Sequence, residues 1–269
     1  MLIPAFLAAC LLAFAGTRTV HREITFPSRG VSVPASIARP ALKRSAPVVL
    51  IAHGHGGTRD ERFGLSVLAD ALARRGVASI RMDFAGCGES TEPRSNNNLT
   101  TMKADMLAAA QYAKAEMNAS SIGLFGYSMG GRIVLEMLAE GFDAGAAAML
   151  APAADTQDLI LTAFPNFTAE HDAARASHAP ELRWYEDMLR YESPAAAAAA
   201  VWDGPALVIF GQDDDVVRPH VCQNVAETLG AQIYDGTGKG HGYGRFREDD
   251  ELLARITQAA ANFFARHLR

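Results

Sequence analysis

The segment LFGYSMGGRIVLEML, residues 124–138, places one serine among three glycines and then changes at once to an apolar helical pattern. The serine is Ser128, and the glycines are Gly126, Gly130 and Gly131. The residues SIGLF before it have the composition of a buried strand, and RIVLEMLAEG after it has the period of a helix that ends in glycine. A strand that turns sharply into a helix, with serine at the turn, is a nucleophile elbow. The segment therefore predicts that Ser128 is a nucleophile.

The glycines of this segment have a steric reason. A serine at such a turn holds a strained backbone, and a Cβ on its neighbours would collide with the adjacent strand and helix. The helix N-terminus then directs free N–H groups and a partial positive charge at the Ser128 oxygen. A G-x-S-x-G pattern also occurs by chance, so the strand, turn and helix around it are what make it informative.

Short apolar runs, most of them ending in glycine, recur along the chain, at residues 46–54, 77–86, 121–126, 144–150, 205–211 and 231–236. Runs of this kind suit strands that are buried on both faces of a parallel sheet. Helical patterns lie between them, at residues 61–76 and 98–117, and a further helical pattern at residues 249–269 closes the chain. Residues 19–26 and 31–40 alternate with period two and fit a pair of strands. The alternation of strands and helices predicts a doubly wound, mostly parallel α/β sheet.

One segment, from about residue 152 to 202, interrupts this rhythm because it contains no run typical of a buried strand. It is rich in aromatic residues, including Phe164, Trp184 and Tyr185. We interpret it as a helical lid insertion over one end of the sheet, with these aromatic side chains lining a substrate pocket. The alternatives are a plain surface excursion and a small core of the insertion's own.

The overall composition indicates a globular protein. The chain has 269 residues, of which 49% are hydrophobic and 20% charged. Its net charge is −5 and no basic cluster stands out, which argues against a nucleic-acid partner. The three cysteines, Cys10, Cys87 and Cys222, show neither a C-x-x-C pair nor a metal-ligand spacing. The sequence leaves the oligomeric state open, a dimer included.

Residues 1–16 form a candidate leader in front of one domain, residues 17–269. The apolar run is too short for a stable membrane-spanning helix. It resembles the apolar region of a secretory signal, and LAAC at residues 7–10 resembles a bacterial lipoprotein box. Because no Lys or Arg precedes the run, an apolar segment packed on the domain is the alternative. We expect a secreted or periplasmic protein, with a cytoplasmic location as the alternative.

An acyl-transfer site needs an oxyanion hole, and two loops offer backbone donors for it. One donor is the N–H of Met129, directly after the nucleophile. The other is expected in HGHGG, residues 53–57, where the N–H of His55 follows the His-Gly pair. The alternative is that His53 and His55 bind a metal, but the sequence offers no evident third ligand. We therefore expect no metal and no cofactor.

A serine nucleophile also needs a base and an acid that orients the base. His241 lies in GTGKGHGYG, a glycine-rich loop after the last strand, whereas the other histidines after Ser128 fall in the insertion or on helices. The acid is expected after the strand at residues 205–211, where three aspartates, Asp213 to Asp215, are adjacent. Spacing alone leaves the choice among the three open.

Six motifs together resemble those of the α/β-hydrolases: HGHGG, RMDFAGCGES, GYSMGG, LAPAAD, GQDDDVV and GKGHGY. The resemblance runs from about Val20 to the end of the chain and is greatest to serine esterases of the cinnamoyl/feruloyl esterase group. It implies that Asp214 is the acid, with Asp213 as the rival. It also implies a carboxylesterase that cleaves small acyl or aryl esters, hydroxycinnamoyl esters among them, through an acyl-enzyme. Two residues depart from that group: His55 replaces an aromatic residue, and Cys87 replaces a frequent histidine.

Other functions remain as alternatives on the same residues. A peptidase, a thioesterase or a lipase would use the same Ser128, Asp214 and His241, and a non-catalytic binding protein would keep only the fold. Dehalogenases of this fold have aspartate at the elbow and dienelactone hydrolases have cysteine, so the serine argues against both.

Overall fold

The computed structural model describes residues 18–163, 187 and 190–268. The candidate leader and the aromatic residues Phe164, Trp184 and Tyr185 lie outside these residues. In the part that is described, no helix combines the length and the apolar character needed to cross a membrane.

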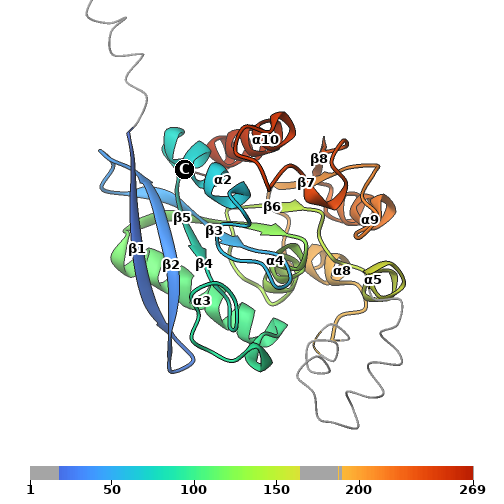
Figure 1. Ribbon diagram of the computed structural model, residues 1–269, viewed down its shortest axis with the longest axis horizontal. Coiled ribbons are helices and arrows are strands. Elements are labelled where there is room, and N and C mark those ends of the chain that lie inside the picture. The colour runs from blue at the N-terminus through green and yellow to red at the C-terminus, as the bar shows by residue number, and fades with distance from the viewer. Residues whose placement is uncertain (1–17, 164–186, 188–189, 269) are drawn as a thin grey trace, which may run out of the picture.

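An eight-stranded sheet runs through the described part of the molecule, in the order β1-β2-β4-β3-β5-β6-β7-β8 (Figure 1). The strands are β1 Thr19–Ser28, β2 Val31–Pro40, β3 Ala46–Ala52, β4 Ala78–Met82, β5 Ala119–Tyr127, β6 Ala146–Leu150, β7 Ala206–Phe210 and β8 Gln232–Asp235. β2 pairs antiparallel with β1 and β4, whereas the pairs from β4 to β8 are parallel. The mostly parallel α/β sheet predicted from the apolar runs is confirmed.

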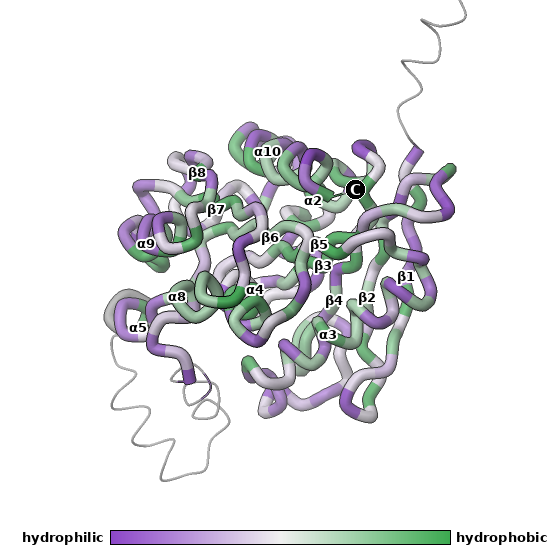
Figure 2. Tube along the Cα trace, turned by 180° about the vertical axis from the view of Figure 1, so that it is seen from behind, coloured by the Kyte–Doolittle hydropathy of each residue, from purple (hydrophilic) through white to green (hydrophobic). Residues whose placement is uncertain are grey.

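Helices cover both faces of the sheet. They are α2 Gly64–Arg74, η2 Arg94–Asn96, α3 Leu99–Glu116, α4 Met129–Ala139, α5 Thr156–Ala163, α8 Pro194–Ala199, α9 Pro219–Leu229, η3 Gly240–Gly242 and α10 Glu251–His267. α2 and α10 pack together on one face, while α3, α4 and α8 lie on the other (Figure 1). The hydrophobic core lies between these layers, and Figure 2 shows hydrophobic residues concentrated along the central strands.

The burial of the strands explains their composition. Every residue of β3, β4, β6 and β7 is buried, because helices cover both sides of these strands. α10 is amphipathic instead, since only one of its sides packs on the sheet and on α2. Its N-cap, Asp250, accepts hydrogen bonds from the N–H groups of Leu252 at 2.9 Å and Leu253 at 3.2 Å.

The two ends of the insertion converge on α4. The buried guanidinium of Arg132 donates from Nη1 to the Ala154 carbonyl and from Nη2 to the Tyr191 carbonyl, both at 3.0 Å. The alanine-rich stretch at the end of the insertion forms α8. Because much of residues 152–202 lies outside the described part, the lid stays a prediction.

Candidate active site

Ser128 lies at the turn between β5 and α4 with a backbone conformation of φ 53° and ψ −113°. A positive φ is strained for a residue with a Cβ, so neighbouring structure must hold it. The Ser128 N–H donates to the Leu150 carbonyl at 2.8 Å, and its carbonyl accepts from the Ala153 N–H at 3.1 Å. The end of β6 and the residues after it therefore hold both peptide groups that flank the Ser128 Cα.

The glycines of the elbow are there because the chain crosses itself closely. A Cβ on Gly126 would lie 2.2 Å from the Gly130 carbonyl oxygen, and a Cβ on Gly130 would lie 2.3 Å from the Ala52 carbonyl oxygen. Both contacts are with backbone atoms, which cannot move aside as a flexible side chain can. The steric reason predicted for these glycines is confirmed.

His241 joins Ser128 to Asp214. Its Nε2 lies 3.1 Å from Ser128 Oγ, and its Nδ1 lies 2.9 Å from Asp214 Oδ2. An ionised carboxylate only accepts hydrogen bonds, so Nδ1 carries the proton and donates it to Asp214. Nε2 is therefore the nitrogen that can accept a proton from the Ser128 hydroxyl.

Asp214, and not Asp213, makes the contact with the histidine. Asp213 Oδ2 instead accepts hydrogen bonds from the N–H groups of Gly238 at 3.0 Å and Gly240 at 2.9 Å. It thus shapes the loop that leads to His241.

Asp214 is almost fully buried, at 3% exposure, and four donors bind its carboxylate. Oδ1 accepts from the N–H groups of Val216 at 3.0 Å and Val217 at 2.9 Å, and Oδ2 accepts from the Tyr243 hydroxyl at 2.7 Å as well as from His241. Burial opposes its ionisation, but the hydrogen bonds from His241, Tyr243 and Val217 outweigh it and lower the pKa of Asp214.

Sequence reasoning missed Tyr243. It follows His241 by two residues, is completely buried, and also accepts the Gly211 N–H at 3.2 Å. The available signal was a tyrosine next to the base in a loop of glycines, which the motif GKGHGY contains.

His53 holds the peptide that precedes His55. Its Nε2 accepts the Phe84 N–H at 3.2 Å, so Nδ1 carries the proton and donates to the Gly54 carbonyl at 2.7 Å. Burial lowers the pKa of His53 to about 4, so the ring is neutral. Both ring nitrogens bind backbone, which leaves neither for a metal. Among the described residues, no group of three His, Cys, Asp or Glu side chains forms a metal site.

The anchored Gly54 carbonyl sets the direction of the next N–H. It accepts from His53 and also from the Gly57 N–H at 3.1 Å. In a trans peptide the N–H of His55 points away from that carbonyl. His55 and Met129 both line the cleft that contains Ser128 and His241, as the oxyanion-hole prediction requires.

Comparison with known proteins identifies the family. A family model described as alpha/beta hydrolase fold matches residues 47–190, which is more than half of the 269 residues. The chain belongs to the α/β-hydrolase fold family. The resemblance drawn from the motifs is thereby confirmed at the level of the family.

Individual proteins are similar to this α/β-hydrolase over different lengths. Est1E from Butyrivibrio proteoclasticus, solved with ferulic acid bound, has a TM-score of 0.71 and 20% identity, covering 91% of this chain and 98% of Est1E. The esterase PF2001 of Pyrococcus furiosus has a TM-score of 0.70 and 15% identity, and the match covers 93% of this chain and 92% of PF2001. The quorum-quenching protein AidA of Acinetobacter baumannii is 30% identical over 116 residues, which is 42% of this chain and only 38% of AidA.

Ser128 of this α/β-hydrolase lines a cleft of about 360 Å³. Its wall combines residues 54–57 with Ser128, Met129 and His241, and with the charged side chains Glu61 and Arg245. The three aromatic residues predicted to line the pocket from the insertion lie outside the described residues, so that prediction stays untested.

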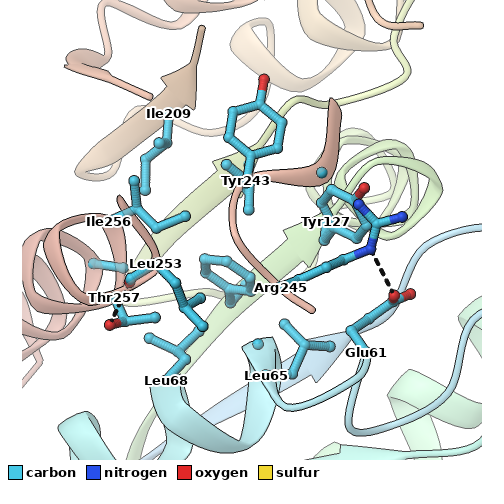
Figure 3. Close-up of a pocket in the computed structure, with 15 residues that line it drawn as sticks. Glu61, Leu65, Leu68, Tyr127, Ile209, Tyr243, Arg245, Leu253, Ile256 and Thr257 are labelled. Carbon is cyan, nitrogen blue, oxygen red and sulfur yellow. Dashed lines mark hydrogen bonds and ion pairs between the residues drawn. The ribbon is translucent and has the colours of Figure 1, made fainter. Parts of the chain in front are cut away.

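A second, apolar cavity of about 30 Å³ lies beside the cleft, between the sheet, α2 and α10 (Figure 3). It is lined mainly by aliphatic side chains, among them Leu65, Leu68 and Ile256. Three residues line both spaces: Glu61, Tyr127 and Arg245. These residues therefore form the wall between the cleft and the apolar cavity.

Proposed function

We propose that this α/β-hydrolase is a serine carboxylesterase that cleaves small acyl or aryl esters through an acyl-enzyme. The observation that carries the proposal is the chain of contacts from Asp214 through His241 to Ser128, with 2.9 Å and 3.1 Å between the bonded atoms. A serine within reach of an oriented base is the arrangement that nucleophilic acyl transfer needs.

In the proposed reaction, each step uses a group that lines the cleft beside Ser128. His241 Nε2 takes the proton from Ser128 Oγ as this oxygen attacks the ester carbonyl carbon. The N–H groups of His55 and Met129 stabilise the oxyanion that forms, and a lost donor of this kind costs about 10²–10³ in rate. The protonated histidine gives its proton to the ester oxygen as the bond from this oxygen to the acyl carbon breaks, so that the alcohol departs and the acyl-enzyme remains. Water, activated by the same histidine, then releases the acid, and no step requires a metal or an organic cofactor.

The substrate class rests on the cleft and on the relatives. A cleft of about 360 Å³ falls in the lower part of the range of small-molecule sites. Est1E, which shares the fold, was solved with ferulic acid, and PF2001 is an esterase. Hydroxycinnamoyl esters therefore belong in the first substrate set. We propose a small-molecule substrate, no nucleic-acid partner, and export to the periplasm or the medium.

Turnover of p-nitrophenyl esters from acetate to decanoate, and of methyl ferulate, tests the proposal. The full chain is compared with Ser128→Ala and with the control Ser45→Ala, whose exposed hydroxyl donates to the Asn118 carbonyl far from the cleft. We expect hydrolysis that Ser128→Ala abolishes and Ser45→Ala retains. Turnover of amides or thioesters alone would assign the site to a peptidase or a thioesterase, and activity that rises at an oil interface would assign it to a lipase.

A further inference from the structure

Two loops must keep their relative positions for Ser128 to react. The oxyanion loop, residues 53–57, follows β3, and the base loop, residues 237–245, follows β8. These strands are at different places in the sheet, with β5, β6 and β7 between them. The side chains of Glu61 and Arg245 meet between the two loops (Figure 3).

Glu61 is attached to the oxyanion loop. Its Oε1 accepts the Gly54 N–H at 3.0 Å, and its side chain is only 9% exposed. A Cβ on Gly57 would lie 1.8 Å from the same oxygen, so the glycine leaves the space that the carboxylate occupies. The carboxylate thus fills the inside of the loop and bonds its backbone.

Arg245 is attached to the base loop. Its Nη1 donates to the His241 carbonyl at 2.9 Å, and the Tyr127 hydroxyl donates to the same carbonyl at 2.7 Å. The guanidinium also lies over the rings of Tyr127, at 5.2 Å, and Phe246, at 4.2 Å. Two donors therefore hold the His241 carbonyl, and two rings hold the guanidinium that is one of these donors.

An ion pair closes the connection. Arg245 Nε lies 3.4 Å from Glu61 Oε2. A continuous path then leads from the Gly54 N–H, through the carboxylate and the guanidinium, to the backbone of His241. This path runs outside the contacts among Ser128, His241 and Asp214.

The local structure keeps Glu61 in place at an energetic cost. Glu61, Arg62 and Phe63 have φ values of 43°, 49° and 83°, which are three consecutive left-handed residues without a glycine. Burial also raises the pKa of Glu61, although Arg245 and the Gly54 N–H act against this effect. A strained turn that buries a carboxylate indicates a positional requirement beyond packing.

We propose that Glu61 and Arg245 are positioning residues that couple the oxyanion loop to the base loop of the active site. The inference rests on the proposed hydrolytic function of Ser128. Glu61 acts on the peptide next to the His55 N–H, and Arg245 acts on the backbone of His241. Neither residue exchanges a proton with the substrate.

Substitution separates the two attachments. Glu61→Gln keeps an oxygen for the Gly54 N–H but loses the ion pair, whereas Glu61→Ala loses both. Arg245→Met loses the ion pair and the bond to the His241 carbonyl. Small displacements of reacting groups cost up to about 10²-fold, so we expect kcat/KM to fall about 10- to 100-fold in the single variants. In the double variant Glu61→Gln/Arg245→Met, kcat/KM should fall no further than in the worse of the two single variants. The reason is that both single variants break the same ion pair.

The pH profile distinguishes positioning from a general loss of structure. The charged groups that face the His241 ring and backbone are Asp214, Glu61 and Arg245, with the hydroxyls of Tyr127, Tyr243 and Ser128. Removing the Glu61 charge destabilises the imidazolium, so the acid limb of kcat/KM should move to lower pH in Glu61→Gln. Removing the Arg245 charge should move it to higher pH.

Rates are expressed per active serine, counted with a fluorophosphonate probe, and the second-order labelling rate of Ser128 is measured alongside. Arg247→Met and Glu248→Gln are matched controls on exposed side chains after the base loop, and they should behave as the wild type. Variants that label and turn over like the wild type per active site would overturn the coupling. So would losses that add in the double variant, or acid limbs that do not move.

The same measurements separate this inference from the proposed function. A wild type that labels with the probe but hydrolyses no ester removes the carboxylesterase proposal, and the labelling rates of the variants still decide the coupling. If the wild type does not react with the probe, both the carboxylesterase proposal and the coupling of the two loops are refuted.

Discussion

The replacement of Asp214 by asparagine tests the hydrogen-bond assignment of the site atom by atom. Asp214 Oδ1 accepts two backbone N–H groups, from Val216 and Val217. The amide oxygen of asparagine must stay at this position, because the reverse orientation would deprive two buried N–H groups of acceptors, at about 1–3 kcal/mol each. The amide NH₂ then takes the place of Oδ2 and faces His241 Nδ1 and the Tyr243 hydroxyl.

This orientation gives the histidine the wrong tautomer. An NH₂ group can only donate to Nδ1, so the ring proton moves to Nε2, which then cannot accept from Ser128. A change of this kind costs about 10⁴ in kcat, equivalent to about 5.5 kcal/mol in the barrier at 1.36 kcal/mol per decade. We therefore expect kcat of Asp214→Asn to be lower than that of the wild type by a factor of about 10⁴, with little change in KM.

The assay is kcat/KM on the best p-nitrophenyl ester, per titrated serine, with Asp213→Asn as the control. In that control the amide oxygen can still accept from Gly238 and Gly240, so most of the activity should remain. More than a tenth of the wild-type activity in Asp214→Asn would refute the tautomer argument. An equal loss in Asp213→Asn would show that the three adjacent aspartates act as one acidic patch.

Three further outcomes follow from single contacts. Gly57→Ala should lower kcat/KM about tenfold or more, because the new Cβ would overlap the Glu61 carboxylate and displace the oxyanion loop. Steady-state kinetics per titrated serine measures this loss. Tyr243→Phe removes a donor to buried Asp214 and should lower the free energy of unfolding in urea by about 1–3 kcal/mol. The raised pKa of Glu61 means that the folded state holds this proton more tightly than the unfolded state, so its contribution to stability is present at low pH and is lost as pH rises through the raised pKa. Thermal unfolding should therefore show the Tm of Glu61→Gln rising relative to the wild type as pH increases.

The sequence was sufficient for the fold because the relevant signals are local. Each buried strand is a short apolar run, and the elbow glycines lie within four residues of the serine that they serve. The antiparallel pair β1 and β2 was equally readable, since each strand alternates with period two. His241 could be predicted as the base because few histidines after Ser128 lie in loops, and the structure places it in contact with Ser128 and Asp214.

The contacts among side chains could not be predicted from local sequence patterns. Glu61 has the pattern of the first residue of an amphipathic helix, yet the helix begins at Gly64 and the carboxylate turns back into the oxyanion loop. Its partner Arg245 is more than 180 residues away along the chain. This pairing depends on three consecutive residues, 61–63, with left-handed backbone conformations. None of the three is a glycine, so the sequence does not indicate this turn. Similarly, sequence spacing made Asp213, Asp214 and Asp215 equal candidates for the acid. Only the structure shows that the Asp214 carboxylate points at His241, whereas that of Asp213 binds Gly238 and Gly240.

The strained residues show how the core supports the site. Of the non-glycine residues described with positive φ, Glu61, Arg62 and Ser128 line the cleft, and Tyr243 binds Asp214. Each such residue costs about 1–3 kcal/mol, which local contacts alone would not offset. The strain persists because β3, β5, β6 and β7 are buried throughout or nearly so and fix the points from which these turns begin. Weakening the sheet should therefore disturb the serine and the Glu61 turn before it unfolds the chain, so activity should decline at lower denaturant concentrations than secondary structure does.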